Sequence, residues 1–249
     1  MEPTIIEHVF VLALIAYFPL DGRKAIRRLR RELDDGVEDA RIRSYRGTVL
    51  DLWIKATLMV GYWAFLDRSW AELGLGLPAG RGLRLSLWAV GIGLGVMVGQ
   101  YVHLVRAGDD AKLPAGIQEV GYMMPLTERD SRWFSGLSVT AGICEELIFR
   151  GFLLAYFGTW FDWPLALLCS SLIFGLGHSY QGPAGVLKTA LVGAAFGGLV
   201  LATGSVWASM ILHAATDWLA GLITYRYRVA DRAGPGGGVR EMDTSEAGF

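Results

Sequence analysis

Long apolar stretches alternate with short polar segments along almost the whole chain, and this pattern predicts a bundle of membrane helices. A helix of ~20 apolar residues, rising ~1.5 Å per residue, is long enough to cross the ~30 Å of hydrocarbon in a bilayer. We therefore predict an all-α, polytopic membrane protein with about seven transmembrane helices. The predicted spans are residues 4–20, 48–66, 85–104, 133–157, 164–178, 186–203 and 206–225.

The composition supports this class of protein and argues against others. Of the 249 residues, 53% are hydrophobic and 19% are charged, whereas soluble domains average ~25% charged residues. The two cysteines, Cys144 and Cys169, are too few for a disulfide scaffold. We expect membrane lipid as a partner, and no nucleic acid. The oligomeric state stays open.

Charge placement predicts the orientation of the chain. Basic residues gather between Arg23 and Arg46, directly after the first predicted span. Because Lys and Arg are enriched in cytoplasmic loops, we expect residues 21–47 in the cytoplasm and the N-terminus outside. Seven spans then put the C-terminus in the cytoplasm, and Arg226 after the last span agrees with this. The expected location is the inner membrane of a bacterial cell.

We predict a single transmembrane domain over residues 1–225, with a catalytic core at about 133–225 and a disordered cytoplasmic tail at 226–249. The basic segment has two interpretations. It is a helix that lies on anionic lipid, or a solvated loop that only sets the topology. The first interpretation rests on the helical spacing of Ile26, Leu29, Leu33 and Val37.

Two of the other predicted spans carry patterns that suggest contacts. In the second span, Asp51 and Lys55 lie four residues apart, so we expect them to pair near its cytoplasmic end. In the third span, Gly91, Gly95 and Gly99 line one face. Such a face is typical of close packing between membrane helices.

The fourth span contains Glu145, Glu146 and Arg150. Each charge at the centre of a membrane helix costs ~2.5–3.5 kcal/mol on insertion scales, so such residues are candidates for function. Glu146 and Arg150 are four residues apart and share a helix face, where they can pair. Glu145 is rotated by ~100° from Glu146, so it points elsewhere and needs a different partner.

Few other polar groups lie at membrane depth. They are His178 at the end of the fifth span and the pair His213 and Asp217, four apart in the seventh. Together with Glu145 they predict a polar catalytic cavity among the C-terminal helices. The alternative interpretation is structural, because a buried ion pair can serve only to fix helix register and a histidine at a helix end is often interfacial.

Three motifs resemble those of the CAAX-protease and bacteriocin-processing (CPBP) family, also called the abortive-infection family. It includes the type II CAAX prenyl endopeptidases. The motifs are Glu145-Glu146-x-x-x-Arg150, Phe174-x-x-x-His178 and His213-x-x-x-Asp217. Their order matches that of the family, and the resemblance covers about residues 133–225. A weaker similarity lies upstream, in the segment that begins at Trp70.

The resemblance implies an intramembrane endopeptidase of the glutamic type, whose partner is a membrane-associated protein or peptide substrate. In that case Glu145 is the general base that activates a water, and His178 helps to hold and polarise it. His213 and Asp217 match positions that stabilise the oxyanion, while Glu146, Arg150 and Phe174 match supporting positions. The third motif often ends in Asn, and an ionised Asp cannot donate a hydrogen bond. Asp217 is therefore either protonated or an acceptor that orients His213, and we favour the second role.

Two other functions stay open. Two histidines and a glutamate are a ligand set of catalytic zinc, so Glu145, His178 and His213 are the metal ligands if the enzyme is a metalloprotease. No His-Glu-x-x-His motif is present, and the glutamic interpretation needs no cofactor. The other alternative is a non-catalytic membrane scaffold or immunity protein. The substrate is equally open among a CAAX-like tail, a bacteriocin-type peptide and a C-terminal sorting tail.

Overall fold

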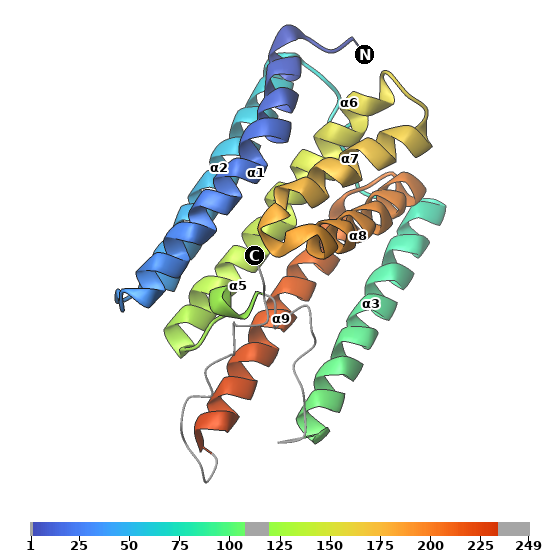
Figure 1. Cartoon of the computed structure of the whole chain (residues 1–249). Helices are drawn as coiled ribbons and strands as arrows, with labels where there is room; N and C mark the ends of the chain where they lie inside the picture. The colour runs from blue at the N-terminus through green and yellow to red at the C-terminus, as the bar shows by residue number, and fades with distance from the viewer. Residues whose placement is uncertain (1, 108–119, 234–249) are drawn as a thin grey trace.

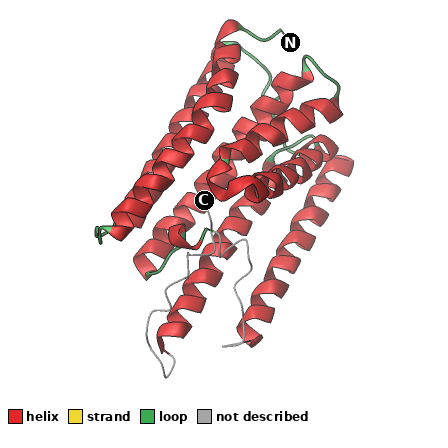
Figure 2. Cartoon of the chain, viewed as in Figure 1, coloured by secondary structure: helices red, strands yellow, loops and turns green. Residues whose placement is uncertain are grey.

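The computed structural model describes residues 2–107 and 120–233, and every regular element in these two ranges is helical (Figures 1 and 2). The observed fold class is therefore the all-α class that we predicted. The elements are α1 (Ile5–Asp34), α2 (Ala40–Phe65), α3 (Gly80–Ala107), η2 (Gly121–Met123), α5 (Glu128–Glu145), η3 (Glu146–Leu153), α6 (Leu154–Gly158), α7 (Trp163–Gly177), η4 (Ser179–Gln181), α8 (Gly182–Thr203) and α9 (Trp207–Ala233).

Three of these elements join end to end into one helix. With α1, α2, α3, α7, α8 and α9, this gives seven long helices in the described part of the chain. α5, η3 and α6 follow one another without a break over residues 128–158, and we call this helix the central rod. It begins at a capping box, in which the Thr127 hydroxyl accepts from the Asp130 amide and the Asp130 carboxylate accepts from the Thr127 amide. Such a reciprocal pair satisfies amide groups that the first turn leaves unbonded.

By length and composition, three helices of the described residues are apolar enough to cross a membrane. They are Ile5–Asp34, Gly80–Ala107 and the helical stretch Ser179–Thr203, and Trp163–Gly177 is a shorter apolar helix. The other predicted spans also form helices. The central rod departs from the apolar pattern because it carries the buried charges Glu145, Glu146 and Arg150.

The central rod lies among the other helices and carries much of the apolar core. α5 packs on α2 and on α9, and η3 and α6 pack on α7. Three side chains of the rod, Ile148, Phe149 and Leu153, are fully buried. α3 forms one edge of the molecule, where it contacts α8 and α9 (Figure 1). The charged stretch of the sequence is thus held at the centre of the bundle.

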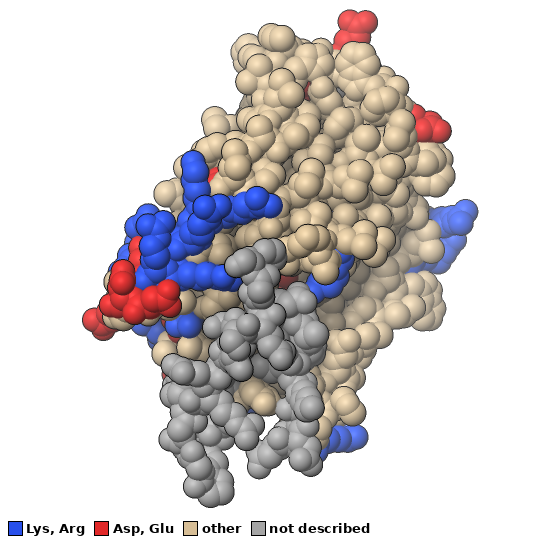
Figure 3. Space-filling model, viewed as in Figure 1, with Lys and Arg blue, Asp and Glu red and all other residues tan. Residues whose placement is uncertain are grey.

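The basic segment has a different structure from either of our two interpretations. α1 continues without interruption through Pro19 to Asp34, so the first span and the start of the basic segment are one helix. Ile26 and Leu29 are buried inside the protein, which leaves them unable to contact lipid. A continuous helix is favoured because these two side chains pack in the protein. Figure 3 shows Lys and Arg side chains gathered where α1 ends and α2 begins, and we call this the basic end of the molecule.

The predicted glycine face of α3 does not pack within the described part of the chain. A Cβ added at Gly91, Gly95 or Gly99 would meet nothing within 4 Å. Close packing instead uses Gly82 and Gly93, where an added Cβ would lie 2.5 Å from the Thr203 carbonyl oxygen and 2.4 Å from the Leu212 side chain. Helix spacing alone could not distinguish these faces, because glycines occur on both.

The last helix extends beyond the predicted boundary of the transmembrane domain. α9 runs to Ala233, so residues 226–233 are helical although we predicted a tail from 226 onward. The rest of the predicted tail, 234–249, lies outside the described residues, as do residues 108–119.

Candidate active site

The central rod changes its winding at the charged stretch. η3 is a π-helix over Glu146–Leu153, and all of its residues are buried. π-helical segments inside α-helices occur frequently at functional sites. Near its end, Gly151 meets the backbone of the loop before α3, where an added Cβ would lie 2.9 Å from the Leu73 carbonyl oxygen. The π-helical stretch therefore includes a close contact between the central rod and the backbone of the loop before α3.

Glu146 is at the centre of the buried charge network. Its side chain is fully buried, and Oε1 lies 2.9 Å from Nη1 of Arg150. The same oxygen lies 2.8 Å from Nδ1 of His213. The ion pair expected from the four-residue spacing is present, and the histidine is a second partner from α9. Because an ionised carboxylate only accepts hydrogen bonds, Nδ1 of His213 donates to it.

Arg150 also stacks on an aromatic ring. Its guanidinium carbon lies 3.9 Å from the centroid of the Phe174 ring, a distance at which the ring face attracts a cation. Gly193 on α8 leaves room for this arrangement, since an added Cβ would come within 3.1 Å of the Phe174 ring and 3.3 Å of Nη2 of Arg150. The phenylalanine of the second motif thus supports the arginine of the first.

Glu145 faces the opposite nitrogen of the same histidine. Its Oε2 lies 3.8 Å from Nε2 of His213, and Oδ2 of Asp217 lies 3.6 Å from that nitrogen. Glu145 is 8% exposed. These separations are too long for direct hydrogen bonds, and at such distances a water can lie between polar groups. His213 therefore separates two glutamates with different surroundings.

His178 belongs to the same cavity but is held differently. It follows the last residue of α7, and its Nδ1 lies 3.0 Å from the Phe174 carbonyl oxygen. Its ring centroid is 4.9 Å from that of Phe174. In the described part of the chain, no hydrogen bond or ion pair joins His178 to Glu145 or His213. The structure thus brings Glu145, His213 and Asp217 together and places His178 beside them.

The close approach of α5 and α9 depends on a glycine that the sequence did not single out. A Cβ added at Gly142 would lie 2.7 Å from Cβ of Ala214, and 2.8 Å from both the Ala214 nitrogen and the Met210 carbonyl oxygen. The absence of a side chain at this position allows His213 to reach Glu146. The sequence shows a glycine one helical turn before the two glutamates, but its role in helix packing is visible only when the facing helix is known.

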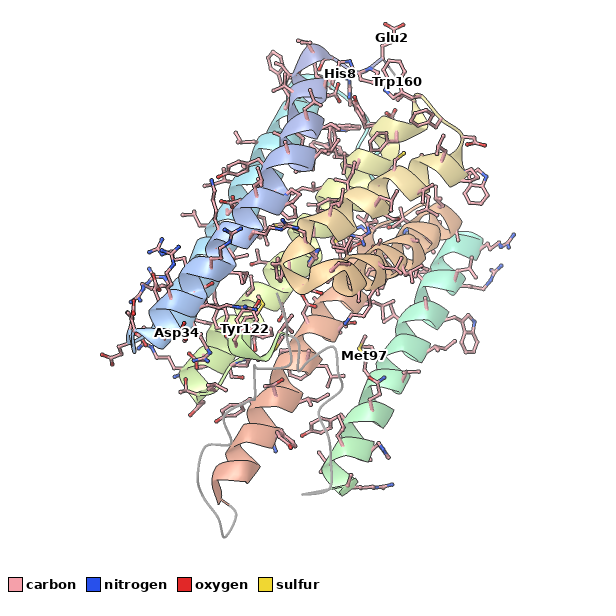
Figure 4. All side chains as sticks on the ribbon, viewed as in Figure 1. Glu2, His8, Asp34, Met97, Tyr122 and Trp160 are labelled. Atoms are coloured by element: carbon pink, nitrogen blue, oxygen red, sulfur yellow. The ribbon has the colours of Figure 1, made fainter. Side chains whose placement is uncertain are left out.

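A cavity of about 710 Å³ contains the predicted site. Glu145, His178, His213 and Asp217 all line it. It extends toward the basic end of α1 and α2, where its lining includes Lys24, Arg28, Glu32 and Arg43. In Figure 4 this end of the molecule carries the labels Asp34 and Tyr122, and the opposite end carries His8 and Trp160.

The groups at this basic end are held by ordinary polar contacts. The hydrogen bonds that Glu32 accepts from Arg28, at 2.8 Å, and from Arg43, at 3.0 Å, lower the pKa of this carboxyl. Burial, and then the charge of Asp130, raises the pKa of Tyr45 above its usual value. Its hydroxyl therefore stays protonated and donates to the Met123 carbonyl oxygen at 2.7 Å.

The metal alternative requires three side chains that converge on one point. Within residues 2–107 and 120–233, no three His, Cys, Asp or Glu side chains are placed so that they could hold a metal ion. Glu145, His178 and His213 do not form such a group in this arrangement, because the described contact of His178 is with the Phe174 carbonyl.

Part of the chain matches a known protein family. Residues 130–219 match the family described as type II CAAX prenyl endopeptidase Rce1-like. No curated protein matches the chain. No solved structure matches it either. The matched range holds all three motifs, and the family is one of proteases. This match supports a CAAX-type intramembrane protease domain of the CPBP family at residues 130–219, and together with the apolar helices it indicates an integral membrane protein.

Proposed function

We propose that this protein is an intramembrane endopeptidase of the glutamic type, in which Glu145 activates a water for attack on a peptide bond. The observation that carries the proposal is the geometry around His213. Its Nε2 faces Glu145 at 3.8 Å and Asp217 at 3.6 Å, in a cavity that also contains His178. A water between these groups would meet both a proton acceptor and proton donors.

In the first step, Glu145 accepts a proton from the water while the water oxygen attacks the carbonyl carbon of the peptide bond. The C=O double bond becomes a single bond, and the negative charge moves to its oxygen. Nε2–H groups of His178 and His213 stabilise this oxyanion, because donors aimed at developing charge lower the barrier. Both rings are then imidazolium ions, since each Nδ1 also donates, to the Phe174 carbonyl oxygen in His178 and to Glu146 in His213. Glu145 then gives its proton to the leaving nitrogen, and the C–N bond breaks.

The remaining residues keep the histidine in place. Glu146 accepts from Nδ1 of His213, which leaves Nε2 directed toward Glu145 and Asp217. Arg150 balances the charge of Glu146 at 2.9 Å. We assign Asp217 the role of an acceptor that orients His213, since an ionised carboxylate cannot itself donate to an oxyanion.

We further propose that all seven long helices cross the membrane, with the N-terminus outside and the C-terminus in the cytoplasm. The basic end of α1 and α2 supports this orientation, because Lys and Arg favour the cytoplasmic side. The substrate would be a membrane-associated protein or peptide, and we expect this membrane to be the inner membrane of a bacterium.

The test uses the full chain reconstituted in liposomes. The probe is a synthetic peptide that ends in S-farnesyl cysteine, two aliphatic residues and methionine, and mass spectrometry identifies the cut. A parallel comparison maps peptide termini in membranes that carry the wild-type protein or Glu145→Gln. We expect cleavage products only with the wild type. Equal products from wild type and Glu145→Gln, with both folded, would refute the proposal.

A further inference from the structure

An ion pair on α2 lies inside the predicted second span, outside the range that matches the protease family. Nζ of Lys55 contacts Oδ2 of Asp51, and the Lys55 side chain is 14% exposed. The ammonium also lies 4.7 Å from the centroid of the Phe18 ring. A lysine inside a membrane span is costly, and nothing in the proposed reaction so far uses it.

Lys55 lies at the same depth in the bundle as Glu145. The rings of Tyr45 on α2 and Phe134 on α5 are in contact, with centroids 5.4 Å apart. From this contact α2 and α5 run side by side in the same direction (Figure 1). Lys55 follows Tyr45 by ten residues and Glu145 follows Phe134 by eleven. At ~1.5 Å per residue, the two are therefore displaced by similar distances of ~15–17 Å.

Both side chains also face the same space. Lys55, Asp51 and Glu145 all line the cavity. Arg150 is also a cation at this depth, but it contacts Glu146 and the Phe174 ring. On the α2 wall of the cavity, Lys55 is the cation at this depth, whereas Arg43 lies at the basic end. Lys55 lies across from the motif residues of α9.

The chemistry of an ammonium group defines what it can bind there. It has three N–H donors and no acceptor, so it can keep its contact with Asp51 and still donate to a second anion. The anionic groups of a peptide are carboxylates, either at the chain end or on acidic side chains. A charge-assisted hydrogen bond of this kind is among the stronger ones in proteins.

We propose that Lys55 binds a carboxylate of the peptide substrate and selects peptides that carry one close to the cut bond. The inference rests on the proposed function and adds a specificity residue to it. Asp51 holds the ammonium toward the cavity. The carboxylate comes from the chain end or from an acidic side chain, and the experiment separates these two sources.

The probes are pairs of peptides cleaved by the reconstituted protein. The two peptides of the first pair differ only at the C-terminus, which is a free carboxylate in one and a carboxamide in the other. The other pair has a carboxamide end and differs by Glu or Gln on the C-terminal side of the cut. If Lys55 binds the chain end, the first pair shows a preference, and if it binds an acidic side chain, the second pair does. In that pair we expect the wild type to cleave the peptide with the carboxylate faster, by on the order of 10- to 100-fold in kcat/KM.

The variants test whether Lys55 causes this preference. Lys55→Met should bring the ratio to about one, and Lys55→Arg should retain most of it. Because Lys55→Met leaves Asp51 without its partner, the double variant Asp51→Asn/Lys55→Met supplies a neutral pair for the same measurement. Lys24→Met, on the cavity wall near the basic end, is the matched control and should keep the wild-type ratio.

Two results would overturn the role of Lys55. The first is a wild-type ratio near one for both pairs, a measurement that needs no variant. The second is a Lys55→Met ratio equal to that of the wild type, even if both rates fall. Glu145→Gln runs in parallel: if it cleaves as fast as the wild type, the proposed function itself fails, whereas an inactive Glu145→Gln confines the failure to Lys55.

Discussion

Nδ1 of His213 lies 2.8 Å from Oε1 of Glu146, so the second of two adjacent glutamates holds the histidine that the first one faces. The two acids therefore have different surroundings. Glu146 is enclosed with Arg150 at 2.9 Å, and Glu145 borders the cavity. This division of roles leads to predictions that separate stability from catalysis.

Glu146→Gln should destabilise the protein more than Glu145→Gln does. It leaves Arg150 buried without a countercharge, and breaking a buried pair by removing one partner costs about 3–5 kcal/mol. Thermal unfolding in detergent, followed by circular dichroism, compares the two variants with the wild type. Cleavage assays on the same samples should show that Glu145→Gln is folded but inactive. Equal losses of stability would argue against separate roles.

Gly142→Ala should lower both stability and activity. Its methyl group would meet the backbone of α9, including the Met210 carbonyl oxygen at 2.8 Å, and would push His213 away from Glu146. Gly136→Ala is the matched control on the same helix, because an added Cβ there meets nothing within 4 Å. That control should be neutral or stabilising by up to ~1 kcal/mol. Similar melting temperatures and rates for both variants would contradict this account.

Asp217→Asn should retain kcat within about tenfold of the wild type, because the amide oxygen can still accept a hydrogen bond. Asp217→Leu has no acceptor and should lower kcat by on the order of 10²–10³-fold, comparable to the loss of one stabilising hydrogen bond at an active site. Steady-state kinetics on the same peptide measure both variants. If Asp217→Leu keeps the activity of Asp217→Asn, then Asp217 does not act through hydrogen bonding.

Removal of metal should leave the cleavage rate unchanged if Glu145 alone activates the water. The reconstituted protein is treated with a chelator, passed over a desalting column and assayed with and without added zinc. Loss of activity that zinc restores would refute the glutamic mechanism and favour Glu145, His178 and His213 as metal ligands. A sample that is desalted in the same way without chelator provides the reference rate.

The sequence by itself determined the helices and the local pairs. Apolar runs predicted the all-α fold, because backbone groups in a membrane must bond within their own segment. Glu146 with Arg150, and Asp51 with Lys55, each lie four residues apart and do pair, since that spacing puts two side chains on one helix face. The three motifs were likewise visible from residue types and order.

Only the tertiary structure decided how distant segments meet. The contact between Glu146 and His213 joins residues 67 positions apart and depends on the absence of a side chain at Gly142. Likewise, α1 continues into the basic segment because Ile26 and Leu29 pack inside the protein. The position of Lys55 opposite the motif residues also depends on how α2 packs on α5. Helical periodicity relates neighbours on one helix, whereas the choice between helix faces depends on packing across the whole bundle.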